Sequence, residues 1–170
     1  MKNNLIFFLL LFFTIVPPVF SASDYVLPYP SSMPGSKGYM FDQVQEKLSP
    51  LWHFGDFGSF KNNLYYADKY IVEAKVLFEY NQYLLATVAL RKSDSYFSRL
   101  ENNLNNASQN GKDITQKREI LMSASQKHVD ILTDIASNTP EDFLWVPEDN
   151  LPTKLHIHTM IEESLHIRRQ

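Results

Sequence analysis

The chain has 170 residues, of which 44% are hydrophobic, and a formal net charge of -3. This size and composition are typical of one globular domain with its own core rather than of a disordered chain. Neither charge sign forms a long run, which argues against non-specific binding to nucleic acid. The chain has no cysteine, and this excludes disulfides, a cysteine nucleophile, a lipid-modified cysteine and thiolate metal sites.

Residues 1–23 are predicted to be a signal peptide. Lys2 gives a positively charged start, residues 5–16 form an almost unbroken apolar run, and small residues follow. Cleavage after Ser21 and cleavage after Ser23 both fit this pattern. The run is shorter than the roughly 20 residues that span a bilayer comfortably, so retention as an anchor is the alternative. We therefore expect an exported, extracytoplasmic protein, secreted or at the outer face of the cytoplasmic membrane, with membrane contact only through an uncleaved signal.

Residues 24–36 are predicted to form a proline-rich extended segment. Proline fixes its own φ and biases the preceding residue toward extended geometry, so "LPYP" is expected to be a short polyproline-like strap. Val26, Leu27 and Tyr29 are expected to lie on apolar surface left open between helices. The alternative is that a partner domain captures the segment as a ligand. A turn and a short helix near residues 39–48 follow.

Four stretches of helical periodicity come next, over residues 59–80, 82–110, 113–138 and 153–169. In each, apolar residues recur at the spacing of a buried helical face. For the first and last stretches the predicted inward residues are Leu64, Ala67, Ile71, Ala74, Phe78, Leu155, Ile157, Met160, Ile161 and Leu165. Gly111 is expected to cap the second stretch. The sequence "TPEDF" predicts a short turn of helix before a proline-bearing connector.

The predicted fold is all-α, with one helical domain over residues 37–170. Strand alternation nowhere extends beyond a few residues, and the connections "NQ" and "GK" are short, as between antiparallel neighbours. We expect an antiparallel bundle of three long helices plus a shorter C-terminal helix and a short N-terminal helix, preceded by the extended proline-rich strap.

Three stretches carry a family resemblance: "YVLPYPSSMPGSKGYMFDQV", "LYYADKYIVEAKVLFEYNQYLLATVALRKSDSYF" and "KHVDIL". Together they resemble the bacterial domain of unknown function 5667. The resemblance covers nearly all of the mature chain and implies an exported, mostly helical protein without a known activity, so it transfers no catalytic residue. The positions that match best are Ala67, Asp68, Lys69, Ser93 and Tyr96. The first helix departs from the family by lacking its basic residues.

The last helix contains the candidate metal ligands. His158, Glu162 and His166 are spaced four apart and therefore share one helical stripe, and His156 lies just before them. Glu163 and His166 form a Glu-x-x-His step like those of carboxylate-bridged metal bundles. The second such step that a di-metal site needs is absent, and the inward face belongs to aliphatic residues. We predict no structural metal site, and adventitious zinc or nickel binding is the alternative.

An aromatic loop is the candidate partner-binding region. Trp52, His53, Phe54 and Phe57 lie in "LWHFGDFGSF", where a proline and two glycines predict a loop. Stacked rings with a few polar groups suit a ligand groove. The competing interpretation, which we favour, is a satellite core that pins the first helix across the bundle.

His128 lies within the apolar repeat of the third long stretch. The functional interpretation is an inward metal ligand or proton acceptor. The structural interpretation, which we favour, is a histidine at the edge of the core that bonds a carbonyl or hydroxyl group.

No motif of a hydrolase or a nucleotide-binding enzyme is present, so we expect no catalytic residue, no enzymatic activity and no cofactor. The leading hypothesis is a non-enzymatic binding or scaffolding protein of the bacterial cell envelope, with another envelope protein or a cell-wall polymer as its partner. The alternative is a metal-binding or metal-responsive envelope protein that uses the histidines of the last helix.

Overall fold

The computed structural model describes residues 25–30, 32–148 and 151–170, and this part of the chain is mostly helical, as predicted. The elements are α2 (Lys37–Leu48), the 3-10 turn η1 (Ser49–Leu51), α3 (Asp56–Glu79), α4 (Tyr83–Phe97), α5 (Leu100–Gln109), α6 (Thr115–Asn138), β1 (Asp142–Trp145), β2 (Thr153–His156) and α7 (Ile157–Arg169). The predicted signal peptide lies outside the described residues. Among the described residues, no helix combines the length and the apolar character needed to cross a membrane.

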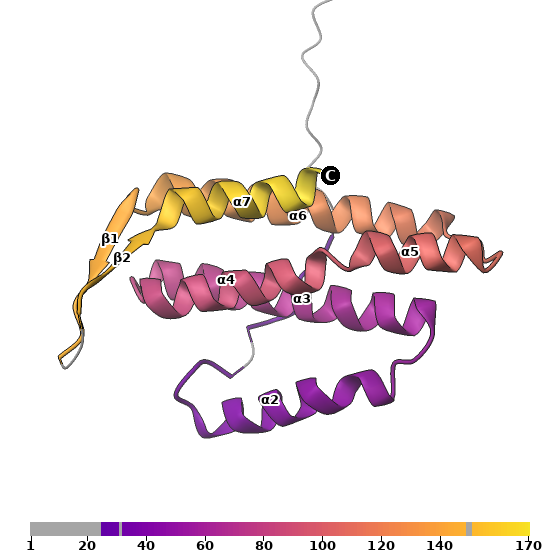
Figure 1. The fold of residues 1–170 in the computed structure, drawn as a ribbon, viewed down its shortest axis with the longest axis horizontal. Helices are drawn as coiled ribbons and strands as arrows, with labels where there is room; N and C mark the ends of the chain where they lie inside the picture. The colour runs from indigo at the N-terminus through magenta and orange to yellow at the C-terminus, as the bar shows by residue number, and fades with distance from the viewer. Residues whose placement is uncertain (1–24, 31, 149–150) are drawn as a thin grey trace, which may run out of the picture.

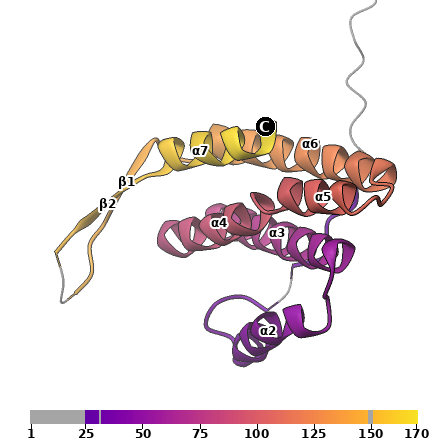
Figure 2. The same cartoon turned by 45° about the vertical axis from the view of Figure 1, so that its right-hand side comes forward.

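The helices are arranged in three levels, which Figures 1 and 2 show from two directions. Helices α6 and α7 run side by side at one level, α3 and α4 form the middle level, and α2 lies alone on the far side. Helix α5 continues beyond α4 and reaches α6. The two strands project from the end of the molecule where α6 finishes and α7 begins.

The core consists of two hydrophobic clusters. The larger is formed by Tyr66, Tyr70, Ile71, Ala74, Leu77, Phe78, Ala86, Ala89, Leu90, Ile131, Leu132, Ile135, Leu155, Ile157, Ile161 and Leu165. The smaller is formed by Phe60, Leu64, Ala67, Phe97, Leu100, Leu104 and Ala124. Ala67, Ile71 and Ala74 are fully buried, so the predicted inward face of α3 is confirmed. Because burial of one large apolar side chain contributes about 1.5–3 kcal/mol, these clusters account for the packing of α3 to α7.

The prediction of one helix over residues 82–110 is wrong, because the chain turns at Ser98 and Arg99 between α4 and α5. The Ser98 hydroxyl donates to the Ser95 carbonyl at 3.2 Å, and Arg99 N–H donates to the Tyr96 carbonyl at 3.3 Å. Such local bonds give the backbone an alternative to the α-helical ladder. Phe97 and Leu100 are both buried in the smaller cluster, so the apolar spacing continues across the break and conceals it.

The helical turn predicted at "TPEDF" and the helix start at Thr153 are also wrong. Strands β1 and β2 form an antiparallel pair there, with Phe143 opposite Leu155. Leu155 is buried, and the Phe143 ring packs against Tyr83 with its centroid 4.7 Å away. Helix α7 therefore begins only at Ile157. Each strand has four residues, which is too short for alternation to distinguish it from a connector.

The described residues 25–30 belong to neither helix nor strand. Leu27 packs against the larger cluster, as expected, but Val26 and Tyr29 are 87% and 93% exposed, so they do not lie on apolar surface. Tyr25, which the sequence did not single out, donates from its hydroxyl to Asp68 at 2.5 Å. This contact ties the start of the described chain to α3.

Candidate functional site

Several polar groups at the contacts between helices form one network, which we call the His128 network. Its members are Asp68 of α3, Ser93 and Asp94 of α4, His128 of α6, and Ser164 and Arg168 of α7. All of them are buried except Asp94, whose side chain is 16% exposed. Hydrogen bonds between these side chains link the four helices.

The protonation of His128 follows from its two neighbours. The ring is fully buried, with Nε2 2.8 Å from Asp68 Oδ1 and Nδ1 3.1 Å from Arg168 Nε. A guanidinium only donates hydrogen bonds, so Nδ1 accepts and the single ring proton lies on Nε2, facing Asp68. Burial lowers the pKa of His128, although Asp68 acts in the opposite direction. His128 is a neutral core histidine, but its partners are charged groups rather than the carbonyl or hydroxyl that was expected.

Arg168 uses its guanidinium donors within the network. Nη1 donates to Asp94 Oδ1 at 2.6 Å and to the Ser164 carbonyl at 2.9 Å, while Nη2 donates to Ser93 Oγ at 2.8 Å. The guanidinium also lies 5.0 Å from the ring centre of Phe97. Burial lowers the pKa of Arg168, and the carboxylate of Asp94 opposes this effect. The Arg168 side chain is fully buried and that of Asp94 is 16% exposed, so the two form a largely buried ion pair.

The His128 network resembles a catalytic Asp–His pair in composition but not in accessibility. A general base needs a free nitrogen that faces a substrate proton. Here Arg168 Nε–H donates a hydrogen bond to Nδ1, and Nε2–H donates one to Asp68. The Ser93 hydroxyl donates to the Ala67 carbonyl at 2.8 Å and is likewise engaged. These groups hold the helices together rather than face a substrate.

A second polar cluster lies beneath α2, and we call it the α2 seam. Glu46 of α2 accepts hydrogen bonds from the hydroxyls of Tyr70 and Tyr96, the latter at 2.6 Å. Lys92 Nζ donates to the Tyr70 hydroxyl at 3.1 Å. The rings of Tyr70 and Tyr96 stack with centroids 6.2 Å apart. Burial, followed by the bond to Glu46, raises the pKa of both tyrosines, so they remain protonated donors.

Two further contacts complete the α2 seam. Lys69 Nζ lies 3.3 Å from Asp42 Oδ2, and the Tyr39 hydroxyl donates to Glu73 Oε1 at 3.3 Å. Glu73 is buried, and its other oxygen, Oε2, is the buried side-chain atom of the described residues that has no hydrogen-bond partner. Burial raises the pKa of Glu73. Helix α2 is thus attached to α3 and α4 through polar groups.

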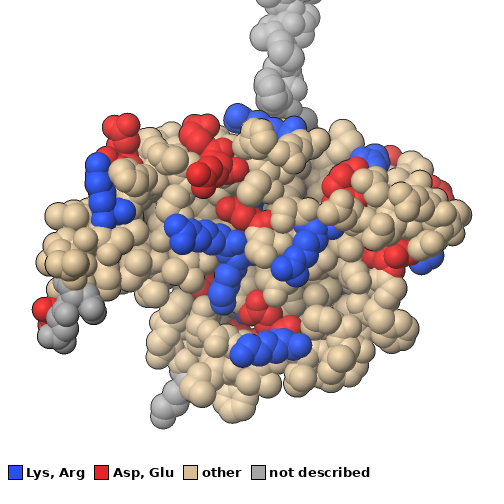
Figure 3. Space-filling model, viewed as in Figure 1, with Lys and Arg blue, Asp and Glu red and all other residues tan. Residues whose placement is uncertain are grey.

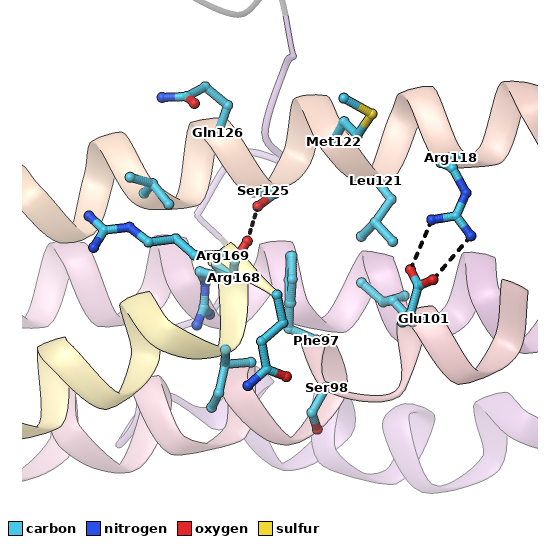
Figure 4. A pocket seen from close by; sticks show the side chains of 14 residues that line it. Phe97, Ser98, Glu101, Arg118, Leu121, Met122, Ser125, Gln126, Arg168 and Arg169 are labelled. Atoms are coloured by element: carbon cyan, nitrogen blue, oxygen red, sulfur yellow. Dashed lines mark hydrogen bonds and ion pairs between the residues drawn. The ribbon is translucent and has the colours of Figure 1, made fainter. Parts of the chain in front are cut away.

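A groove of about 530 Å³ lies between α5, α6 and the end of α7 (Figure 4). The larger part of its exposed lining is apolar and comes from Phe97, Leu100, Leu121, Met122, Val129 and Ile167, while the other eight lining residues are polar or charged. Arg118 and Glu101 close one end through an ion pair of 3.0 Å, and Arg169 lies toward the other end. The groove therefore presents apolar surface between charged ends.

The aromatic loop does not form the expected satellite core. Trp52 and Phe54 are 65% and 82% exposed. His53 and Phe54 border a shallow hollow whose other lining is mostly polar, whereas Phe57 is half-buried beneath Lys112, whose Nζ is 5.4 Å from its ring centre. The four residues therefore do not converge on one groove. Their role as a partner-binding site stays a prediction.

The candidate metal ligands of α7 are not brought together. His158 Nε2 is 3.1 Å from the Thr139 carbonyl, His166 Nδ1 is 3.0 Å from Gln170 Nε2, and Glu162 is exposed. His156 pairs with Asp142 at 2.7 Å. In residues 25–30, 32–148 and 151–170 no group of three or more histidine, aspartate or glutamate side chains is placed to hold a metal ion. Metal binding stays a hypothesis without support from this geometry.

Of the positions that carry the family resemblance, Ala67, Asp68 and Ser93 lie in or against the His128 network, and Lys69 and Tyr96 lie in the α2 seam. Compared with known protein families, curated proteins and solved structures, the chain matches none of them. The resemblance to the domain of unknown function 5667 therefore stays a prediction.

Proposed function

We propose that this protein is a non-enzymatic binding domain exported to the bacterial cell envelope, and that the groove between α5, α6 and α7 holds an apolar segment of a partner protein. The apolar lining of this groove carries the proposal. Burying apolar side chains against such a surface is the dominant source of affinity in peptide recognition by grooves. A cell-wall polymer fits less well, because sugars stack on open aromatic faces and the aromatic residue in this lining, Phe97, is buried.

The use of the buried charges supports a binding role over a catalytic one. Asp68, His128, Asp94 and Arg168 bond to one another and leave no group directed at a substrate. Their energetic role is to fix how the helices meet. In this proposal the helices form an antiparallel bundle, and residues 25–30 act as a strap that Tyr25 fastens to it.

Export is tested by the mass and N-terminal sequence of the protein recovered outside the cytoplasm. We expect a chain that begins after Ser21 or Ser23. Recovery of the intact chain in the cytoplasm would overturn this part of the proposal.

The groove is tested by site-specific photo-crosslinking in the native cell. A photoreactive residue at Met122, which is 67% exposed at the groove, is compared with one at Val88, which is 46% exposed on α4 and lies outside it. We expect one partner protein to be captured at Met122 and not at Val88.

The purified partner is then titrated into the Met122→Glu and Val88→Glu variants. A charge in the groove is expected to weaken binding at least tenfold, whereas Val88→Glu is expected to bind as the unchanged protein does. Equal capture at both positions, or equal affinity of both variants, contradicts the groove as the binding site.

A further inference from the structure

The outer side of α2 is apolar, although its inner side packs on the body of the protein. Met40, Phe41, Val44 and Leu48 are between 41% and 78% exposed, and at about 100° per residue they fall within one arc of the helix. Three further apolar residues follow closely after the helix, Leu51, Trp52 and Phe54, which are 70%, 65% and 82% exposed. We call these seven residues the α2 face.

The acidic side chains of α2 are arranged opposite to this face. Residues 37–54 contain two acids, Asp42 and Glu46, and both turn inward to Lys69 and to the tyrosines of the α2 seam. Lys47 is exposed. In Figure 3 the lowest part of the described surface, at α2, is tan, and a basic side chain and then acidic side chains lie above it. Among the described side chains of residues 37–54, the α2 face therefore has Lys47 at its border and no acid.

The shape and composition of the α2 face favour a bilayer as its occupant. Figures 1 and 2 show α2 as the outermost helix, so the face is a ridge. A ridge with Trp, Phe and aliphatic side chains, bordered by lysine, has the features of a helix that lies in the membrane interface. The chain before it also carries an apolar run at residues 5–16, which directs this end of the protein to a membrane during export.

We propose that the α2 face binds the surface of a bilayer that contains anionic phospholipids, with Phe41, Trp52 and Phe54 inserted at the level of the headgroups. This binding requires that Asp42 and Glu46 point inward, because anionic lipid would repel their negative charges if they lay on the α2 face. This membrane contact is independent of the groove and goes beyond the contact expected from the signal segment alone.

The test uses the processed chain that starts at Asp24, since both hydrophobic clusters are formed by residues that follow it. Vesicles of phosphatidylcholine with about one third phosphatidylglycerol are compared with vesicles of phosphatidylcholine alone. We expect the protein to sediment with the anionic vesicles. In a Trp145→Phe variant, in which Trp52 is the remaining tryptophan, we expect the emission to shift to shorter wavelength on binding.

Two matched double variants separate the α2 face from general surface hydrophobicity. Phe41→Ser with Phe54→Ser is expected to weaken vesicle binding at least tenfold. Val88→Ser with Leu144→Ser removes two exposed apolar residues elsewhere and is expected to change it less than twofold. Lys47→Glu is expected to weaken binding to the anionic vesicles about fivefold or more and to leave the weaker binding to neutral vesicles unchanged.

Three results overturn the proposal. The first is the absence of sedimentation with anionic vesicles, and the second is equal weakening by the two double variants. The third is a soluble dimer of the unchanged protein that Phe41→Ser with Phe54→Ser dissociates, because the α2 face would then bind a second copy of the chain.

Discussion

The His128 network and the α2 seam are both buried and polar, yet they join their helices in different ways. In the network, every group bonds to another, and the surrounding contacts of α3, α4, α6 and α7 are apolar. In the seam, Glu73 Oε2 has no hydrogen-bond partner among the described residues, and the apolar side of α2 faces outward. Helices α3 to α7, which we call the body, are therefore stabilised by their hydrophobic core, and the polar groups fix how these helices are oriented. Helix α2 is attached to the body mainly through polar groups and buries little apolar surface. We infer that α2 is the less stable element.

The largest effect is expected from breaking the His128 network at Arg168. Arg168→Met leaves the largely buried Asp94 carboxylate without its ion-pair partner and Nδ1 of His128 without a donor. Removing one partner of a buried pair typically costs about 3–5 kcal/mol of unfolding free energy. Denaturant unfolding of the purified protein measures this change.

The matched control is the next residue along α7. Arg169 is exposed, so Arg169→Met is expected to change stability by less than about 0.5 kcal/mol. Adding Asp94→Asn to Arg168→Met removes the stranded charge and is expected to restore part of the loss. Equal unfolding midpoints for the two single variants would show that the network does not stabilise the body.

The second effect is a loss of stability in acid that originates at His128. Burial holds the pKa of this imidazole below its ordinary value of about 6.5, so the unfolded chain binds a proton that the folded chain excludes. The stability is complete above that ordinary value and falls as the pH decreases toward the lowered folded pKa. The slope is up to about 1.4 kcal/mol per pH unit.

Unfolding curves measured from pH 7 to pH 5 test this slope against a His128→Gln variant. Glutamine does not titrate, so the variant is expected to be less stable at pH 7 but to lose less stability on acidification. Parallel pH profiles would assign the acid sensitivity to other groups.

The third effect is local and breaks the α2 seam. Glu46→Ala removes the acceptor of the Tyr70 and Tyr96 hydroxyls, and unsatisfied buried donors cost about 1–3 kcal/mol. We expect this cost to appear as faster hydrogen exchange in α2, because an element held by few apolar contacts opens before the global transition. Amides of α6 serve as the internal control. Uniform acceleration across both helices would show that α2 and the body unfold as one unit.

The helices of the body were largely predictable from the sequence, because their apolar periodicity extends over many residues. Helix α3 repeats the spacing of Leu64, Ala67 and Ile71 over many turns, so the inward face is specified several times over. The strands were missed because four residues give too few alternations. The break at Ser98 was missed because the flanking apolar residues keep helical spacing on both sides of it.

The polar groups were less predictable, because each depends on partners that are distant in the sequence. Arg168 continues the inward stripe of Ile157 and Ile161, so a charge on an apolar face was a visible signal. Its partners, however, lie 40 and 74 residues earlier, at His128 and Asp94, and no local pattern pairs them. The fold brings these positions together only after the apolar faces have packed.

The smallest effect concerns the unpartnered oxygen in the α2 seam. Burial raises the pKa of Glu73 above that of the unfolded chain, so the folded protein favours the protonated form. This contribution to stability is present below the ordinary glutamate pKa and is lost as the pH rises through the raised folded value. At neutral pH the ionised Glu73 carboxylate therefore lowers the free energy of unfolding. Glu73→Gln keeps the shape and the acceptor for Tyr39, and we expect it to stabilise the protein at pH 7 by less than about 1 kcal/mol.

The pH dependence distinguishes this explanation from a simple change in packing. The gain from Glu73→Gln is expected to shrink as the pH falls, because the native glutamic acid then becomes neutral like the amide. Lys69 and Lys92 also act on this carboxylate, and both lower its pKa, so the gain stays modest. A gain that is equal at pH 4 and pH 7, or a loss at pH 7, would mean that ionised Glu73 is held by the seam. In that event the polar groups of the α2 seam would be as well partnered as those of the His128 network.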